Sequence, residues 1–133
     1  MTADGDSSFM RWLAVVFAAL SLSGLAGAAG AAGVPPFPRL PGAWSHADIN
    51  VTLNRKPHTL SLDRGKITKV SGTQLTLREK TGGVVSTVVV PLSASSIVTI
   101  DGLRSTIYSL RPKMNAQTMR IDGGPAVRIR ATT

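Results

Sequence analysis

The sequence predicts a small all-β domain of five or six short strands, arranged as a barrel or a sandwich, and three observations lead to this fold class. First, segments after Arg64 alternate apolar and polar residues, which is the two-residue period of a strand with one buried face. Second, glycine-bearing turns separate these segments. Third, the longest apolar segment of this region, residues 84–92, is dominated by β-branched valine.

The clearest local signal is the segment GKITKVSGTQLTL, residues 65–77. Its two leucines alternate with threonine and arginine, so both occupy one strand face. Gly72 can take the positive φ that a tight hairpin turn needs. Ile67 and Val70 are three residues apart, so the first strand either carries a β-bulge or uses both of its faces. The segment predicts a β-hairpin that opens the domain.

The other elements are predicted from the same signals. Residues 84–92 form a central strand, because they are β-branched and free of charge, and Pro91 either ends it or marks a bulge. The spacing of Leu103, Ile107 and Leu110 predicts one helical turn that covers an end of the barrel. Alternation predicts the remaining strands at Ile49–Leu53 (an edge strand), Ile97–Ile100, Met119–Ile121 and Val127–Ile129, the last two with their apolar side chains inward.

The N-terminal residues have the pattern of a targeting segment. Residues 12–22 are a compact apolar run preceded by Arg11, and the small residues up to Gly33 offer cleavage sites. The nine residues before Met10 carry two aspartates, so Met10 is a candidate start. We therefore predict a signal peptide over residues 1–33 and export to the periplasm or the cell exterior. The alternative is a leader that is retained as a membrane anchor.

The mature chain divides into two parts in this interpretation. Residues 34–62 are a linker with a possible edge strand; residues 34–42 hold four prolines, which favours an extended spacer. Residues 63–133 form the β-domain.

The chain has no cysteine, which excludes disulfides, thiolate nucleophiles and cysteine-based metal sites. Removing residues 1–33 takes away one arginine and two aspartates, which leaves fourteen basic and five acidic side chains.

The order of motifs from Arg64 to Thr132 resembles a family of small exported bacterial β-barrel domains that are OB-like and of unknown function. The segments that carry the resemblance are GKITKVSGTQLTL, VVVPLSASSIVTIDGL, STIYSLRPKM and PAVRIRAT. The chain departs from the family's pattern at one loop, where Pro112 is followed by Lys113 instead of glycine. A type II turn favours glycine at that position, so a type I turn is expected here.

The residue types disfavour catalysis and point to a non-enzymatic role without a cofactor. Only His46 and His58 can serve as bases at neutral pH, and both lie outside the predicted barrel. The sequence has no G-x-S-x-G motif, and its acidic residues are scattered singly. We therefore expect a binding or accessory domain rather than an enzyme.

The net positive charge predicts a polyanion-binding surface on the polar faces of neighbouring strands. Its candidate residues are Arg64, Lys66, Lys69, Arg78, Lys80, Arg128 and Arg130. Nucleic acid is disfavoured, because it needs stacking aromatic residues and the barrel offers only Tyr108. Anionic lipid headgroups or envelope polymers fit better, and a solvated basic surface with no specific partner is the plain alternative.

Two further hypotheses remain open at this stage. Exported OB-like proteins that bind copper(I) or silver(I) use methionine and histidine with a tryptophan over the ion, and the candidate residues here are Trp44, His46, Met114 and Met119. A protein partner can instead add a strand to an exposed sheet edge, for which Ile49–Leu53 and Ala126–Arg130 are the candidate edges.

Overall fold

The structure is a computed structural model that describes residues 33–133, and this part of the chain is almost entirely β-sheet. The described part of the chain contains eight strands, rather than the five or six expected. They are β1 (His46–Leu53), β2 (Lys56–Val70), β3 (Gln74–Thr81), β4 (Val84–Pro91), β5 (Ile97–Ile100), β6 (Leu103–Ser105), β7 (Asn115–Ile121) and β8 (Ala126–Thr132), with a single 3₁₀ turn η1 (Ile107–Ser109) between β6 and β7. The predicted all-β class is confirmed.

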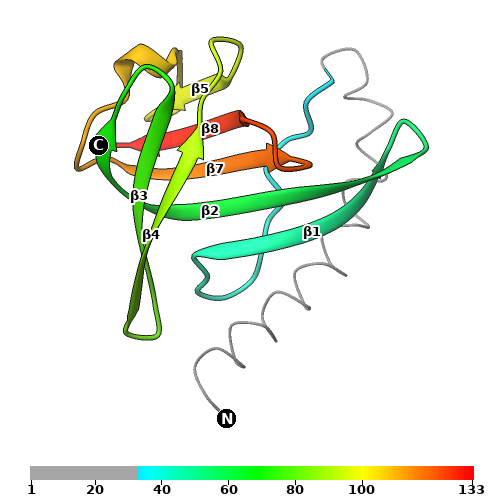
Figure 1. The fold of residues 1–133 in the computed structure, drawn as a ribbon, viewed down its shortest axis with the longest axis horizontal. Helices are drawn as coiled ribbons and strands as arrows, with labels where there is room; N and C mark the ends of the chain where they lie inside the picture. The colour runs from blue at the N-terminus through cyan, green and yellow to red at the C-terminus, as the bar shows by residue number, and fades with distance from the viewer. Residues whose placement is uncertain (1–32) are drawn as a thin grey trace.

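All eight strands belong to one sheet (Figure 1). Seven of them follow the order β4-β3-β2-β7-β8-β5-β6, and β1 pairs with β2 beside this path. The strand β2 is 15 residues long and organises it. Its partner on one edge is β7, while its other edge is shared by β1 along the first half and by β3 along the second. The sheet is not closed, so the predicted closed barrel is wrong. The strand β2 also runs through the boundary expected between linker and β-domain at residue 63.

The hairpin of β2 and β3 is confirmed, and its first strand carries the β-bulge that the spacing suggested, between Ile67 and Lys69. The turn differs from the expectation, because Gly72 does not have a positive φ. The Ser71 hydroxyl instead accepts hydrogen bonds from the backbone amides of Thr73 and Gln74, at 3.4 and 3.1 Å. A serine therefore shapes this turn.

The strand β4 is an edge strand and not a central one. Three of its valines are about half exposed, and of the strand's side chains only Val90 is buried. A β-branched, uncharged segment is typical of a buried strand, but the same composition occurs here at an edge. Pro91 is the last residue of the strand, which is one of the two alternatives predicted for it.

The segment after β5 fits the prediction in part. Ile107 and Leu110 are buried around η1, whereas Leu103 lies in β6 and is exposed. At the following turn, Lys113 has a φ of 77°, the value of a type II turn at this position, so the expected type I turn is wrong. A lysine here adopts the left-handed backbone conformation that glycine takes without strain.

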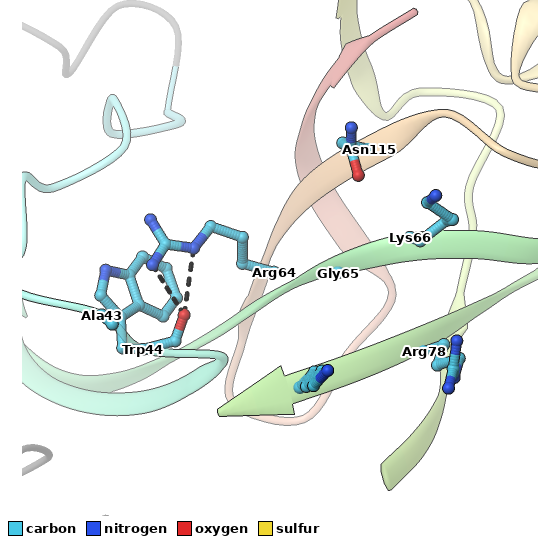
Figure 2. A pocket seen from close by; sticks show the side chains of 8 residues that line it. Ala43, Trp44, Arg64, Gly65, Lys66, Arg78 and Asn115 are labelled. Atoms are coloured by element: carbon cyan, nitrogen blue, oxygen red, sulfur yellow. Dashed lines mark hydrogen bonds between the residues drawn. The ribbon is translucent and has the colours of Figure 1, made fainter. Parts of the chain in front are cut away.

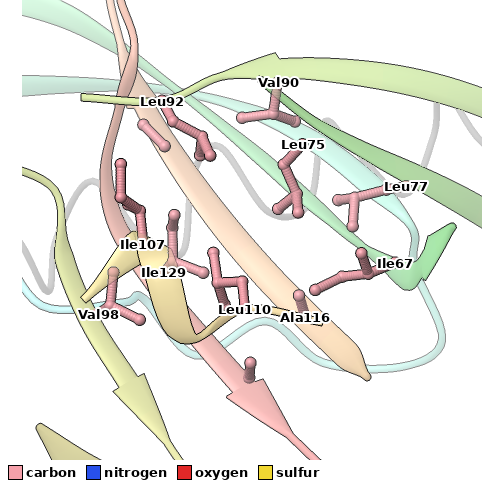
Figure 3. Close-up of a cluster of buried hydrophobic side chains, with 12 residues drawn as sticks. Ile67, Leu75, Leu77, Val90, Leu92, Val98, Ile107, Leu110, Ala116 and Ile129 are labelled. Carbon is pink, nitrogen blue, oxygen red and sulfur yellow. The ribbon is translucent and has the colours of Figure 1, made fainter. Parts of the chain in front are cut away.

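Two apolar clusters lie on opposite faces of the sheet. The first is built by β3, β4, β5, β7, β8 and η1 with the second half of β2, and Figure 3 shows its side chains converging. It contains Ile67, Leu75, Leu77, Val90, Leu92, Val98, Ile107, Leu110, Ala116, Ala126, Ile129 and Ala131. The second is built by β1, β7 and the first half of β2, and contains Trp44, Ala47, Ile49, Val51, Leu60, Leu62 and Met119.

The alternation of the last two strands is only partly as expected. Met119 and Ile121 belong to the second cluster, whereas Ile129 belongs to the first. Val127, two residues before Ile129, packs against the second cluster, because the register of β7 and β8 shifts at this point. A bulge thus moves one expected inward residue to the other face.

The proline-rich segment lies against the sheet. Val34, Phe37 and Leu40 pack on the second cluster, and Pro35 and Pro38 are buried. Because prolines fix an extended backbone without amide donors, the segment covers the sheet without adding a strand. Among residues 33–133 no helix has the length and apolar character needed to cross a membrane. The predicted signal peptide, Gly33 apart, and the candidate start at Met10 lie outside the described residues.

Candidate anion-binding site

A shallow depression of about 460 Å³ opens on the sheet face that carries the second cluster, beside Trp44 (Figure 2). It is lined by Ala43, Trp44, Arg64, Gly65, Lys66, Arg78, Lys80 and Asn115. Four of the seven basic residues predicted to form a polyanion surface therefore meet in one place. Among residues 33–133, no acidic residue lines the depression.

The strand register places these side chains in rows across the sheet. Arg78 of β3 is opposite Lys66 of β2, which is opposite Asn115 of β7. One step along the strands, Arg64 is opposite Gln117, which is opposite Arg130 of β8. Since directly paired residues share a face, both rows lie on the same surface.

Arg64 forms the inner wall of the depression. Its guanidinium donates from Nε and Nη2 to the carbonyl oxygen of Trp44, at 3.0 and 2.8 Å, and lies 4.3 Å from the centre of the Trp44 ring (Figure 2). Burial and the nearby charge of Arg130 lower the pKa of Arg64, although it stays charged at any ordinary pH. Trp44 is buried beneath it, so its ring is not an open stacking surface.

Lys66, Arg78 and Lys80 are exposed, and within the described chain none of them makes a hydrogen bond or an ion pair. Lys66 and Arg78 are direct cross-strand neighbours with the same charge. Like charges in that position destabilise a sheet by roughly 0.2–1 kcal/mol. An anion placed between them would offset this repulsion. The pair is therefore the part of the site best suited to bind an anion.

The three remaining predicted residues have different surroundings. Lys69 follows the bulge on the same face and is exposed, but it lies outside the depression. Arg128 donates to the carbonyl oxygens of Pro35 and Val34, at 3.0 and 3.2 Å. Arg130 donates to Gln117 Oε1 at 2.8 Å and lies 5.1 Å from the Phe37 ring. These two arginines therefore contact the proline-rich segment, a role that the sequence did not suggest.

A polar cluster lies on the opposite face of the sheet, and sequence reasoning missed it. His46 Nδ1 is 2.7 Å from Asp63 Oδ1, and His46 Nε2 is 3.2 Å from Asp48 Oδ1. The Asp63 carboxyl is buried in the sheet, and the side chain of Glu79, also buried, acts with His46 to lower its pKa. An aspartate directly after the alternating leucines Leu60 and Leu62 was the only sequence signal for it.

Hydrogen bonding sets the charge of this cluster. The hydrogen bond to Asp63 outweighs burial and raises the pKa of His46. Burial favours the neutral form of Asp63, but the hydrogen bonds from His46 and Glu79 prevail and lower its pKa. His58, the other histidine, pairs with Asp122, with 2.6 Å between Nδ1 and Oδ2. Both histidines thus hold strands and turns together.

The residues considered for copper(I) or silver(I) are not gathered in one place. Trp44 and Met119 belong to the second apolar cluster, and Met114 packs on the first. His46 lies on the sheet face opposite Trp44, engaged with Asp63. Residues 33–133 contain no group of three or more His, Asp or Glu side chains placed to hold a metal ion.

Comparison with protein-family models, with curated proteins and with solved structures finds no match. The resemblance to exported OB-like domains therefore stays a prediction from the sequence motifs. Any function must be argued from the site itself.

Proposed function

We propose that this chain is an exported, non-enzymatic binding domain that holds an anionic polymer of the cell envelope on its basic sheet face. One observation carries the proposal: Lys66 and Arg78 stand directly opposite each other, open to solvent, with Lys80 beside them in the same depression. Uncompensated like charges cost stability unless a ligand supplies the opposite charge. Export rests on the N-terminal sequence pattern.

The shape of the site favours an extended ligand over a small one. The depression is open, and the exposed cations continue beyond it to Lys69. Neighbouring strands are about 4.8 Å apart, so the cations form a ladder that a chain of regularly spaced sulfate, phosphate or carboxylate groups can follow. Lysine heads bind such groups as point charges with little geometric demand.

The test is the binding of the full chain, purified as the cell produces it, to dextran sulfate and to polyglutamate as probes. Each cation facing an anionic surface contributes about 1 kcal/mol, so the double variant Lys66→Gln/Arg78→Gln should bind roughly 30-fold more weakly. Raising the salt concentration from about 0.1 to 1 M shortens the Debye length from about 10 to 3 Å and should also weaken binding.

The matched control is Arg39→Gln/Lys56→Gln, which removes the same charge from exposed positions outside the depression. It should reduce affinity several-fold less than the site variant. Equal losses in the two variants would show that only net charge matters, and binding that is unchanged at high salt would contradict an electrostatic site. Preference for vesicles that contain phosphatidylglycerol over both polymers would replace the polymer by a membrane surface.

A further inference from the structure

The outer edge of β4 is the least protected part of the sheet. Among the described residues no strand pairs with it. It has no charged residue over its length, and its only proline is the last residue. Val84, Val85 and Val89 are 50, 45 and 48% exposed. Figure 1 shows that the tip of the β3–β4 hairpin projects beyond the rest of the sheet.

The other edges carry the features that normally prevent strand pairing. The edge strand β6 is three residues long and contains Arg104. The strand β1 contains His46 and Asp48. Short length and charged side chains are the usual protection of edge strands, and a long uncharged edge without them invites a further strand.

The sequence of β4 is complementary to itself. In an antiparallel pair of identical strands related by a two-fold axis perpendicular to the sheet, residues pair symmetrically about one central residue. With Thr87 at the centre, Thr87 meets its own copy, Val85 meets Val89, and Val84 meets Val90. Threonine–threonine and valine–valine are favourable cross-strand pairs. The exposed Val85 and Val89 of one copy thereby cover those of the other, and the exposed Val84 lies beside the buried Val90 of the other copy.

Electrostatics permits this pairing despite the positive charge of the chain. The cation closest to the axis in this row is Arg78, which is opposite Thr87 on β3. Two copies of Arg78 would be separated by three strand spacings, about 14 Å. At physiological ionic strength the Debye length is about 8 Å, so their repulsion is largely screened.

We infer that two copies of this chain pair through β4, antiparallel about Thr87, into one continuous sheet. The two-fold axis is perpendicular to the sheet, so both basic depressions lie on the same face. The row Asn115–Lys66–Arg78–Thr87 continues into its symmetry copy. The inference does not depend on the proposed polymer binding, and salt separates the two: it strengthens the dimer by screening the cations, whereas it weakens polymer binding.

Sedimentation equilibrium of the full chain, purified as the cell produces it, tests the pairing. We expect a monomer–dimer equilibrium whose dissociation constant falls as salt rises from about 0.05 to 0.5 M. Thr87→Lys places two lysines opposite each other at the axis and should raise the dissociation constant at least tenfold. Thr52→Lys, the same change at an exposed position of β1, should leave it unchanged. A monomer at every concentration, or equal effects of the two variants, would overturn the inference.

The register has its own test, which adds no charge to the edge and uses the absence of cysteine from the chain. Thr87→Cys places two thiols directly opposite each other and should give a disulfide-linked dimer under mild oxidation. Val85→Cys should not, because its two copies are four residues apart along the strands, about 14 Å. Two results would overturn the register centred on Thr87. One is that Val85→Cys cross-links as efficiently as Thr87→Cys; the other is that neither variant cross-links.

Discussion

The two halves of β2 use the two faces of the sheet in opposite ways. In the first half, Leu60 and Leu62 point into the second apolar cluster, while Asp63 on the other face is buried and pairs with His46. In the second half, Ile67 points into the first apolar cluster, while Lys66 on the other face lines the basic depression. Along β2, one face is therefore apolar in the first half and polar in the second, and the other face is polar in the first half and apolar in the second.

The change of side occurs where β2 changes its neighbour. The strand β1 pairs with β2 up to Asp63, and β3 pairs with it from Lys66 onward. Each neighbour brings its own apolar face, and the two are on opposite sides of the sheet. The side chains of β2 alternate between the two faces along the strand. What changes is the face that the apolar residues of the neighbouring strand cover. One strand thus belongs to two cores, and the basic site lies outside both, on the surface that the second cluster leaves uncovered.

The largest expected effects come from removing a leucine from either core. Leu62 and Leu75 are fully buried in the second and first clusters, respectively. Leu62→Ala and Leu75→Ala should each lower the free energy of unfolding by about 2–5 kcal/mol. Because β2 is shared, urea denaturation should show one cooperative transition in both variants. Two separate transitions in Leu62→Ala would mean that the cores unfold independently, which would contradict the shared strand.

The next effect is expected at the point where the two halves meet. A Cβ atom on Gly65 would lie 2.5 Å from the backbone oxygen of Arg78, so β2 and β3 must move apart in Gly65→Ala. The expected cost is about 1–3 kcal/mol by urea denaturation, as for other overpacked sites. Gly72→Ala is the control, because its Cβ meets nothing within 4 Å and its φ is not positive. A comparable loss in the control would attribute the effect to glycine flexibility rather than to close approach.

The sequence contained part of this arrangement. The apolar positions change phase between Leu62 and Ile67, which are five positions apart and therefore lie on opposite faces of a regular strand. Alternation and turn residues were enough to predict the β2–β3 hairpin, the edge strand β1 and the presence of β7 and β8. For the bulge in β2 they left two alternatives, a bulge or the use of both strand faces. They were not enough to predict that β2 extends back to Lys56, because a strand that changes its buried face looks like two short segments.

The basic site, like the fold, was predictable from the sequence only in part. Alternation placed the basic residues on strand faces, so their gathering on one surface followed from correct pairing of neighbouring strands. What the sequence did not show is which cations are already engaged, because Arg64 and Arg128 donate to backbone carbonyls of residues far away in the chain. Composition gives no information on such contacts. The edge position of β4 was also hidden, because exposure depends on how strands are ordered and not on their own residues.

A smaller effect, with a defined pH dependence, is expected from His46→Gln. The pKa of His46 is raised above its ordinary value of 6.5, so its stabilising effect is complete below that pH and is lost as the pH rises through the raised value. The pKa of Asp63 is lowered from 3.8, so its contribution is lost only in more acidic solution. The wild-type chain should therefore be most stable between about pH 4 and 6.5.

The variant should lose about 2 kcal/mol at pH 5, because a charged hydrogen bond to a buried carboxylate is removed, and less at pH 8. Thermal unfolding at a series of pH values measures both. The groups that face His46 are Asp48 and Asp63, with Glu79 and Arg120 acting on Asp63. A loss of stability in His46→Gln that is the same at pH 5 and at pH 8 would contradict the assignment of this pH dependence to His46.

The smallest expected effect on stability comes from Lys66→Gln, in the basic half of β2. It should have the opposite sign to the effect of removing a leucine from the apolar cores. Lys66→Gln removes one of two like charges that stand opposite each other, so it should raise the free energy of unfolding by a few tenths of a kcal/mol at low salt. The gain should disappear near 1 M salt, where the Debye length is about 3 Å. The same variant should bind dextran sulfate about five-fold more weakly. A gain in stability together with a loss of affinity is expected of a residue kept for a ligand, whereas a loss of stability would show that Lys66 holds the fold.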